Sequence, residues 1–359
     1  MSFKNVIKRK NKLLLPISWL YVAGVRIFNF LYDSGLKGST RFSLPLICVG
    51  NLSVGGTGKS PMVEYLVRLL KEQYSIAVVS RGYKRKTKGL LMASATTTAD
   101  DIGDEPMQLH KKFPGVPIAV SAQRAVAVAA LLRQQKPEVI ILDDAFQHRA
   151  LQAGFNILLT EYSNLFADDY YLPAGQLRDL KSNYKRAQCI IVTKCPPDLT
   201  SEQARATCNK LQPVSGQPVF FAALKYGQPQ TLFGNTPVLF ESVQHLLLVT
   251  GIANPLPLKR ELQQYQKDIR TFYFEDHYDF EQKDIVAILE AYHRFPPGTA
   301  AIITTEKDGA RLQKFQPQLE RANTWCIPVS HSFLLGETEK FNILINDFIR
   351  NVDKQKNKT

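Results

Sequence analysis

A glycine-rich turn that follows an apolar run is the most informative feature of this chain. The segment PLICVGNLSVGGTGKSP, residues 45–61, leads into Lys59 and Ser60. Because glycine has no side chain, backbone N–H groups in such a turn can approach phosphate oxygens, and the helix that follows adds its positive N-terminal end. A lysine at this place can bridge the β- and γ-phosphates, and a serine hydroxyl can ligate Mg²⁺.

This pattern predicts a P-loop that binds a nucleoside triphosphate together with Mg²⁺. The loop consists of Ser53, Val54, Gly55, Gly56, Thr57, Gly58, Lys59 and Ser60. Ser53 stands where the P-loop pattern has its first glycine, so the match departs at one position. The alternative is a tight glycine turn between a strand and a helix, with no ligand.

Two carboxylates follow a second apolar run. Asp143 and Asp144 end the segment EVIILDD, residues 138–144, where P-loop enzymes hold a second contact to Mg²⁺. We interpret them as a Walker B pair, although such residues can also cap a helix or stabilise a turn. Gln147 follows and is a candidate to line the same end of the sheet.

Two other segments carry groups suited to proton transfer. GDEP, residues 103–106, places Asp104 and Glu105 before a helical stretch, where periodicity alone favours the interpretation that Asp104 caps the helix and Glu105 interacts with its dipole. FEDHYDF, residues 274–280, holds His277 among acidic residues. A lone histidine is usually structural, but with an aspartate from elsewhere in the fold it could take a proton from a hydroxyl nucleophile.

Three arginines are candidates for phosphate recognition. Arg81 and Arg124 follow predicted strands, and Arg178 lies in the loop LPAGQLRD, residues 172–179. A planar guanidinium can bind two phosphate oxygens at once. The alternative is that each arginine forms an ordinary surface salt bridge.

Alternating strands and helices must position these groups. Short apolar runs typical of buried strands occur at residues 75–80, 117–121, 138–144, 155–161 and 188–194, with helical stretches between them. We therefore expect an α/β fold with a P-loop NTPase-type doubly wound, mainly parallel sheet, whose ligands lie at the carboxyl ends of the strands. The apolar runs at 245–251 and 299–308 predict a second, smaller α/β domain. The expected division is an N-terminal membrane-interface helix (1–38), a nucleotide-binding domain (39–215), a connector with room for two strands (216–242), the smaller domain (243–349) and a basic tail (350–359).

The composition indicates which kind of partner and which cellular compartment to expect. The net charge of +13 and the pI of about 9.4 predict an anionic partner. The five cysteines are widely spaced and form no C-x-x-C pair, which is typical of reduced thiols in a cytoplasmic protein.

The N-terminus suggests contact with a membrane. Four lysines and one arginine lie within residues 4–12, and a mostly apolar segment follows at 13–32. On a helix the polar residues of this region fall on one face, opposite a wide apolar face that includes Trp19 and Phe28. We expect a helix that lies in the membrane interface and is drawn to anionic lipid. The alternatives are a helix docked on the protein core, a membrane span or a signal peptide.

Taken together, the motifs resemble one family. VGNLSVGGTGKSP, SRGYKRK, GDEP, DDAFQH, LPAGQLRD, TGIANP, EDHYDF and TTEKD occur in the order seen in the tetraacyldisaccharide 4'-kinases of the lipid A pathway. The resemblance implies ATP-dependent phosphorylation of the 4'-hydroxyl of a tetraacyl glucosamine disaccharide 1-phosphate. It also implies Mg²⁺ as cofactor and a peripheral location at the cytoplasmic face of the bacterial inner membrane.

The resemblance also implies roles for individual residues. Asp104 and His277 match the pair that activates the sugar hydroxyl. Phosphate and Mg²⁺ positions match Lys59, Ser60, Glu105 and Asp143, and further site positions match Arg124, Gln147, Arg178 and Asp179. Two positions depart from the pattern: Ala145 stands where glycine is frequent, and the shorter Asp179 replaces a usual glutamate.

The sequence motifs are also compatible with other functions. Within P-loop proteins the main alternative is a GTPase-like switch or a metal-insertion ATPase, and outside enzymes it is a noncatalytic, membrane-bound nucleotide sensor. A nucleic-acid partner is not expected, because the basic residues cluster at the N-terminus and no recognition motif is present.

Overall fold

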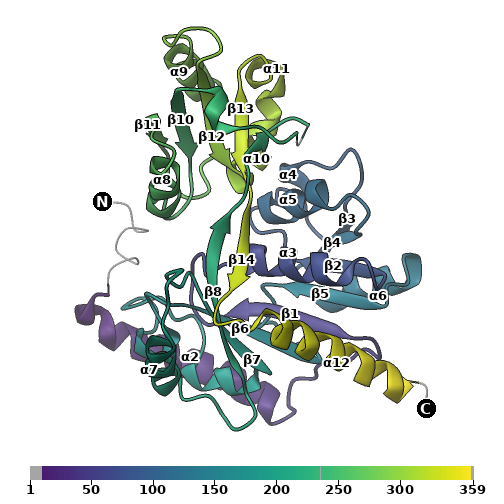
Figure 1. Cartoon of the computed structure of the whole chain (residues 1–359). Helices are drawn as coiled ribbons and strands as arrows, with labels where there is room; N and C mark the ends of the chain where they lie inside the picture. Colours follow the sequence, from purple (N-terminus) through teal and green to yellow (C-terminus); the bar gives the residue numbers. More distant parts are fainter. Residues whose placement is uncertain (1–9, 235, 357–359) are drawn as a thin grey trace.

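The computed structural model describes residues 10–234 and 236–356, which form two α/β units (Figure 1). The larger unit contains a nine-stranded sheet, and the smaller unit contains a five-stranded sheet. This architecture agrees with the fold class predicted from the sequence. The N-terminal lysines and arginine before residue 10 lie outside the described residues.

The larger sheet has the strand order β14-β8-β7-β6-β1-β5-β2-β4-β3. The strands span Leu46–Asn51 (β1), Ile76–Ser80 (β2), Leu91–Met92 (β3), Ile118–Val120 (β4), Val139–Asp143 (β5), Phe155–Glu161 (β6), Cys189–Thr193 (β7), Val219–Tyr226 (β8) and Val329–Phe333 (β14). The central pairs are parallel, whereas β3 and β14 run antiparallel at the two edges. β1 lies between β5 and β6, with Val49 opposite Asp143. The turn after β1 therefore begins beside the carboxylate that ends β5.

Helices cover both faces of this sheet. Alternate side chains of β1 point to opposite faces, so Ile47 joins one apolar core and Cys48 the other. The core that contains Ile47 is covered by α3 (Lys59–Leu70), α5 (Asp104–Lys112) and α12 (Thr338–Lys356); the opposite core is covered by α6 (Arg124–Gln134) and α7 (Ser201–Leu211). Short helices α4 (Ala99–Ile102), η1 (Lys12–Leu14), η2 (Phe166–Asp168) and η3 (Lys181–Arg186) lie in the connections.

The smaller unit repeats this layered design. Its sheet has the order β11-β10-β12-β13-β9, and only β9 is antiparallel to its neighbour. The strands span Gln230–Thr231 (β9), His245–Thr250 (β10), Asp268–Tyr273 (β11), Ala300–Thr305 (β12) and Thr324–Ile327 (β13). Its helices are α8 (Leu256–Gln263), α9 (Gln282–Tyr292), α10 (Glu306–Leu312), α11 (Gln316–Leu319), η4 (Phe240–Ser242) and η5 (Gln313–Phe315).

A two-stranded ribbon of β8 and β14 joins the units, as Figure 1 shows. The arrangement differs from the expected division at three places. The connector 216–242 contains β8, which belongs to the larger sheet. The segment 243–349 contains β14 and most of α12, which return to the larger unit because Phe333 and Phe341 stack on each other and meet the Phe220 ring edge-on. The expected tail from residue 350 begins as the last turns of α12.

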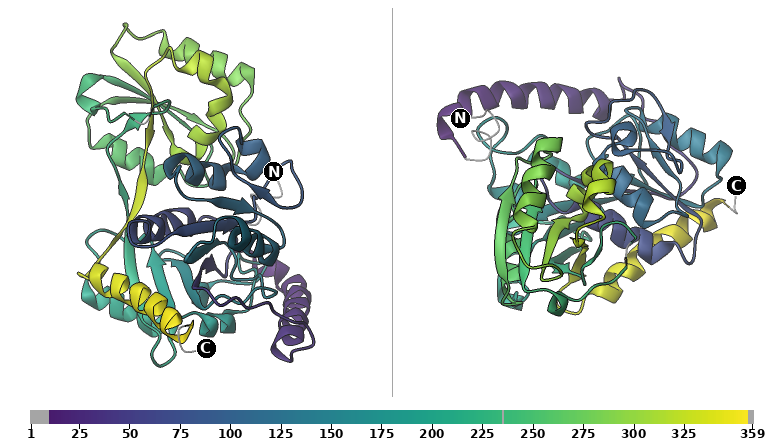
Figure 2. Two further views of the ribbon diagram at one scale, coloured as in Figure 1. Left: turned by 90° about the vertical axis from the view of Figure 1, so that its right-hand side faces the viewer. Right: turned by 90° about the horizontal axis from the view of Figure 1, so that it is seen from above.

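The N-terminal helix α2 (Leu15–Asp33) lies along the outside of the larger unit (Figure 2). Its polar side faces the protein: Ser18 and Asn29 are buried, and Ser18 Oγ donates to the Tyr171 carbonyl oxygen at 2.9 Å. Large apolar side chains on its other side are exposed, among them Trp19 at 70%. Among the described residues, 12–33 form one helix that is long and apolar enough to cross a membrane.

A buried charge cluster joins the two units. Lys112 Nζ of α5 lies 2.7 Å from Glu64 Oε2 of α3 and also pairs with Glu306 of α10. Gln108 Nε2 donates to Glu64 Oε1 at 2.8 Å. Burial and the nearby Glu64 charge raise the pKa of Glu306, and Lys112 is the cation that the two carboxylates share, while Arg68 Nη2 also lies 3.0 Å from Glu64 Oε2.

We predict that Lys112→Met lowers the stability of the protein by about 3 to 5 kcal/mol at neutral pH, since two buried carboxylates lose their shared cation. The loss should shrink toward about pH 5. The folded-state pKa of Glu306 is already raised, and without Lys112 it rises further, so protonation at lower pH relieves the repulsion. Urea unfolding at several pH values measures this effect. Lys86→Met, which breaks an exposed pair with Asp100, is the control; a loss that grows as the pH falls would contradict the prediction.

Candidate active site

The predicted P-loop lies between β1 and α3. Gly55 and Gly58 have φ values of 112° and 84°, which favour glycine. A Cβ atom at Gly55 or Gly56 would meet no atom within 4 Å, so the top of the loop is open for a ligand. The peptide bond between Thr57 and Gly58 is fixed by β7, because Thr193 Oγ1 donates a hydrogen bond to the Thr57 carbonyl oxygen at 2.8 Å.

Lys59 takes part in a network of polar groups at the end of β1. Its Nζ lies 3.5 Å from Asn51 Oδ1 and 3.9 Å from Asp144 Oδ1. Arg178 donates to Asn51 Oδ1 at 2.8 Å and pairs with Asp144. Burial acts to raise the pKa of Asp144, but the charges of Lys59 and Arg178 outweigh it and lower that pKa. The two cations therefore gather beside the open loop.

Asp143 fits a metal ligand. It is buried, and its Oδ2 accepts a hydrogen bond from Ser80 Oγ at 2.9 Å. Its Oδ1 has no hydrogen-bond partner among the described residues. Burial, together with the charges of Glu105 and Asp144, raises its pKa to about 7. A buried carboxylate with an unpaired oxygen and acidic neighbours is stabilised by a cation.

The donor set suits Mg²⁺ rather than a metal held by protein alone. Within the described residues no group of three or more His, Cys, Asp or Glu side chains could enclose a metal. Mg²⁺ usually binds through one or two carboxylates, with phosphate oxygens and water completing its shell. Asp143 and the Ser60 hydroxyl, with Asp144 and Glu105 nearby, match that requirement.

Several other polar atoms at this end of the sheet are buried without a partner in the described part of the chain. They are Asn51 Nδ2, Thr57 Oγ1, Gln147 Oε1, Arg124 Nε and Arg178 Nε. Buried polar atoms are normally hydrogen-bonded, so a cluster of unpaired ones indicates a place for polar ligands. Burial and the positive charge of Arg81 lower the pKa of Arg124. Arg81 and Arg124, two of the three predicted arginines, therefore lie near each other, and the Arg81 side chain is exposed.

Asp104 and His277 come from different units and meet at their interface. Asp104 begins α5, and His277 lies in the loop after β11. The distance from His277 Nδ1 to Asp104 Oδ2 is 3.3 Å. Burial would raise the pKa of Asp104, but the hydrogen bond with His277 and the adjacent Arg311 lower it. Glu105 follows Asp104 directly, and its charge acts on Asp143, so the pair lies next to the predicted metal ligands.

A hollow of about 430 Å³ lies between α2 and the part of the larger unit that carries Gln147, Arg178 and Asp179. It is lined by Leu20, Tyr21, Gly24, Val25, Phe28 and Asn29 of α2 and by Gln147, Arg178 and Asp179 of the larger unit. Asp179 is buried and accepts hydrogen bonds from Asn29 at 3.2 Å and Asn183 at 2.6 Å. It therefore fastens α2 to the edge of the site.

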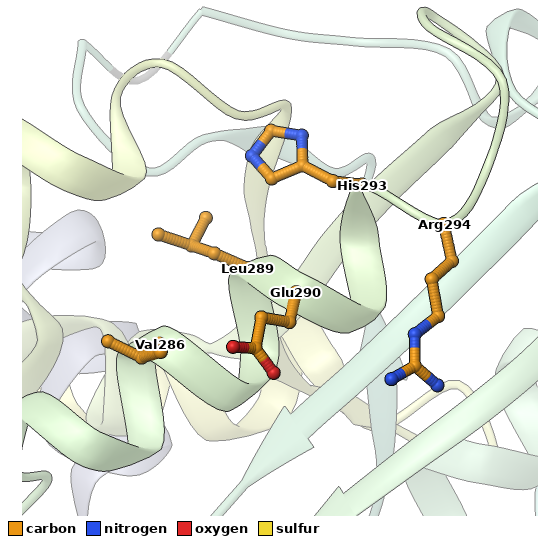
Figure 3. Close-up of a pocket in the computed structure, with 5 residues that line it drawn as sticks. All are labelled: Val286, Leu289, Glu290, His293 and Arg294. Carbon is orange, nitrogen blue, oxygen red and sulfur yellow. The ribbon is translucent and has the colours of Figure 1, made fainter.

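A second hollow lies elsewhere, on the outer side of α9 in the smaller unit (Figure 3). Its volume is about 490 Å³, and its lining consists of Val286, Leu289, Glu290, His293 and Arg294. None of the predicted site residues is among them. The candidate site is therefore the region around the P-loop.

Four residues of the candidate site were not identified from the sequence: Asn51, His331, Lys307 and Arg311. Asn51 follows the apolar run directly, and that position was a usable signal. His331 of β14 approaches the P-loop: its Nε2 lies 2.9 Å from the Gly58 carbonyl oxygen, and burial lowers its pKa to about 4. Lys307 and Arg311 of α10 contact His277. Lys307 lies within the TTEKD motif, but no pattern in the sequence connected it with His277.

Comparison with known proteins identifies the family. The family model described as Tetraacyldisaccharide-1-P 4'-kinase, LpxK, matches residues 10–350. The chain belongs to this family. A tetraacyldisaccharide 4'-kinase of Phocaeicola vulgatus is 41% identical over 362 residues, covering 98% of this chain and 99% of the relative. Another, of Bacteroides fragilis, is 40% identical over 351 residues, covering 95% and 93%.

A solved structure agrees with this membership. LpxK from Aquifex aeolicus, crystallised in complex with ATP, superposes with a TM-score of 0.74 at 29% identity and covers 94% of this chain and 98% of its own. The family and the fold class predicted from the sequence are therefore confirmed.

We predict that Lys59→Ala slows phosphoryl transfer by about 10²- to 10³-fold, because a fixed cation beside the transferring phosphoryl group is lost. Steady-state kinetics with saturating ATP measure the change, which should appear in kcat. Lys71→Ala, at the other end of α3, removes an equal charge far from the loop and is the control. Near-normal turnover of the Lys59 variant would contradict the assignment of the loop.

Proposed function

We propose that this chain transfers the γ-phosphoryl group of ATP to the 4'-hydroxyl of a tetraacyl glucosamine disaccharide 1-phosphate, a step of lipid A biosynthesis. Family membership supports the reaction class. The observation that carries the assignment of residues is the Asp104–His277 contact at 3.3 Å, made across two units next to a P-loop. A nucleotide sensor has no need for such a pair, whereas a kinase with a hydroxyl acceptor does.

The residues around the P-loop would hold the nucleotide and its metal. Backbone N–H groups of 55–58 would receive the phosphates, and Lys59 would neutralise charge on the transferring group. Bound Mg²⁺ would supply further neutralisation between the phosphate oxygens, held by Ser60 and Asp143 with Asp144 and Glu105 close by. Arg178 would keep Asp144 and Asn51 in place through its contacts to both.

The Asp104–His277 pair would manage the proton of the acceptor hydroxyl. His277 Nε2 would accept that proton as the hydroxyl attacks the phosphoryl group, and the Asp104 carboxylate would orient the ring through Nδ1. A general base of this kind matters because sugar hydroxyls stay protonated at neutral pH. The lowered pKa of Asp104 keeps its carboxylate ionised for this role.

The hollow beside α2 would receive the lipid acceptor. Its α2 side is mainly apolar, and Gly24 leaves one part of the helix surface without a side chain. Its other side offers Gln147 and Arg178, which suit sugar and phosphate groups. Arg81 and Arg124 would add positive charge near the acceptor. A lipid that binds here would have its acyl chains against α2 and its sugar toward the P-loop.

The same helix would place the enzyme at a membrane. The polar side of α2 is occupied by the protein, whereas Trp19, Ile27 and Phe30 are exposed at 70%, 63% and 63%. An apolar helix face next to a lipid-binding hollow suits a helix that lies in the bilayer interface. We infer a peripheral association with the cytoplasmic face of the inner membrane, favoured by anionic lipid and by the net charge of +13.

The reaction is tested by incubating the full chain with radiolabelled ATP, Mg²⁺ and the tetraacyl disaccharide phosphate, then mapping the phosphorylated position. We predict that Asp104→Asn and His277→Ala each slow the transfer by roughly 10²- to 10⁴-fold with little change in ATP affinity. The double variant should be scarcely slower than the slower single variant, because the two groups act as one unit.

The smaller unit offers a matched control for this experiment. His245 and Asp268 form a pair of the same 3.3 Å length at the opposite end of β10, so His245→Ala and Asp268→Asn should leave turnover unchanged. If the Asp104/His277 double variant slowed the transfer by the product of the two single effects, the two residues would have independent roles. Absence of 4'-phosphorylated product from the folded wild-type protein would refute the proposed function.

We predict that the triple change of Trp19, Ile27 and Phe30 to Ser weakens binding to anionic liposomes at least tenfold, because apolar area leaves the interface. ATP binding should be retained. Liposome sedimentation measures the partitioning, and the control replaces Leu239, Val286 and Ile343, exposed apolar residues away from α2, with Ser. Equal partitioning of the two triple variants would show that α2 is not the membrane contact.

A further inference from the structure

The helix α10 supplies side chains that contact the Asp104–His277 pair but have no role in the reaction described above. It carries the TTEKD motif at its start and continues to Arg311. Its first turn is firmly anchored, because Asp308 is fully buried and accepts hydrogen bonds from Thr250 Oγ1 at 2.8 Å and the Gly251 N–H at 3.1 Å. The helix is thus a rigid support within the smaller unit.

Arg311 extends from this support to the larger unit. Its Nη1 donates to Asp308 Oδ1 at 2.9 Å, and its Nε donates to Asp104 Oδ2 at 2.7 Å. The guanidinium is buried and has a fixed planar geometry. Held by Asp308 on one side, it determines where the Asp104 carboxylate lies relative to His277.

Lys307 contacts the other side of the imidazole. Its Nζ lies 3.0 Å from His277 Nε2. An ammonium group can only donate hydrogen bonds, so Nε2 must be the acceptor. The ring proton then lies on Nδ1 and points to Asp104 Oδ2 at 3.3 Å. Both ring nitrogens are satisfied in this tautomer.

The other protonation states fit the surroundings poorly. With the proton on Nε2, that N–H would face the Lys307 ammonium, and the bare Nδ1 would face a carboxylate oxygen. In that state Arg311 Nη2, which lies 3.3 Å from Nδ1, could donate a hydrogen bond to it. This one hydrogen bond is outweighed by the two repulsive contacts, with the Lys307 ammonium and with the Asp104 carboxylate. A ring protonated on both nitrogens would also point an N–H at the ammonium, and the Asp276 Oδ1 atom, 4.0 Å from Nε2, is too far away to accept a hydrogen bond from it. The contacts select the Nδ1–H tautomer.

We propose that α10 is the positioning element of the Asp104–His277 pair, with Arg311 setting the carboxylate and Lys307 holding the imidazole as the Nδ1–H tautomer whose Nε2 lone pair faces the acceptor site. This inference rests on the proposed function, since it assigns His277 Nε2 as the atom that receives the hydroxyl proton. In this role Arg311 acts through the Asp104 carboxylate, and Lys307 contacts Nε2 only until the acceptor hydroxyl takes its place.

The acceptor hydroxyl has to replace Lys307 at Nε2. Carboxylates near the ammonium make that exchange feasible, because Glu105 Oε1 lies 3.7 Å and Asp276 Oδ1 4.0 Å from Lys307 Nζ. Lys307 can shift toward them when the sugar binds. It would then leave an imidazole already in the correct tautomer.

The first test reads the tautomer directly and needs no activity. Full-length protein labelled with ¹⁵N-histidine is studied by long-range ¹H–¹⁵N correlation, and the signals of His277 are assigned as those lost in His277→Ala. We expect the Nδ1–H pattern in the wild type and a change to a mixed or Nε2–H pattern in Lys307→Met. Lys314→Met, which breaks an exposed pair with Asp279 and a contact with the Phe315 ring, should keep the wild-type pattern.

The second test is kinetic. We expect Lys307→Met and Arg311→Met each to lower kcat roughly 10- to 100-fold while the KM for ATP stays unchanged, as for a misplaced catalytic group. In the His277→Ala background the same substitutions should lower kcat by less than about threefold, because their effect on the reaction depends on the imidazole. Arg311→Lys, which keeps the charge, serves where Arg311→Met does not fold, and it should recover part of kcat.

Two results would overturn the proposal: an unchanged His277 tautomer in Lys307→Met, or losses that multiply with His277→Ala. These outcomes differ from a failure of the proposed function. If the wild type produced no 4'-phosphorylated lipid, the tautomer experiment would still show whether Lys307 fixes the ring.

Discussion

The contact between Asp104 and the side chains of His277 and Arg311 is the constraint on which the rest of the structure depends. The carboxylate belongs to the larger unit, and both partners belong to the smaller one, so the pair exists only while the units keep their present arrangement. Two features maintain it. The β8–β14 ribbon joins the units covalently, and the buried Lys112 cluster links α3, α5 and α10. The cluster binds together the same helices that carry the P-loop lysine, Asp104 and Arg311, so it positions both halves of the site at once.

The nucleotide half of the site could be predicted from the sequence because its parts are local. The P-loop occupies consecutive residues, and the roles expected of its glycines, Lys59 and Ser60 follow from their spacing. Asp143 was identifiable as the last residue of an apolar run, since parallel neighbours place such ends together. The layered α/β fold followed from the same runs. The N-terminal helix was also predicted, and Ser18 and Asn29 of its expected polar face are buried, whereas Arg26 of that face is exposed. The pairing of the helix with Asp179 and Asn183 depends on residues about 150 positions away.

The remaining contacts could not be predicted because they join distant segments whose meeting is decided by tertiary packing. Arg311 reaches Asp104 across 207 positions, and His331 reaches Gly58 across 273. The return of β14 and α12 to the larger unit was missed for a similar reason: an amphipathic helix at the end of a chain does not reveal which core it covers. In this protein the aromatic packing of Phe220, Phe333 and Phe341 decides it.

The ribbon that joins the units also touches the nucleotide site, which gives the arrangement a mechanical consequence. His331 lies on β14, and its ring approaches Gly58 so closely that a Cβ atom there would stand 2.9 Å from it. With its pKa lowered to about 4, His331 is neutral at physiological pH and donates one hydrogen bond from Nε2 to the Gly58 carbonyl oxygen. Any movement of the ribbon must therefore act on the loop at the start of α3. The same ribbon leads to the unit that holds His277 and Arg311, so one strand connects the predicted P-loop with the unit that contributes to the Asp104–His277 contact.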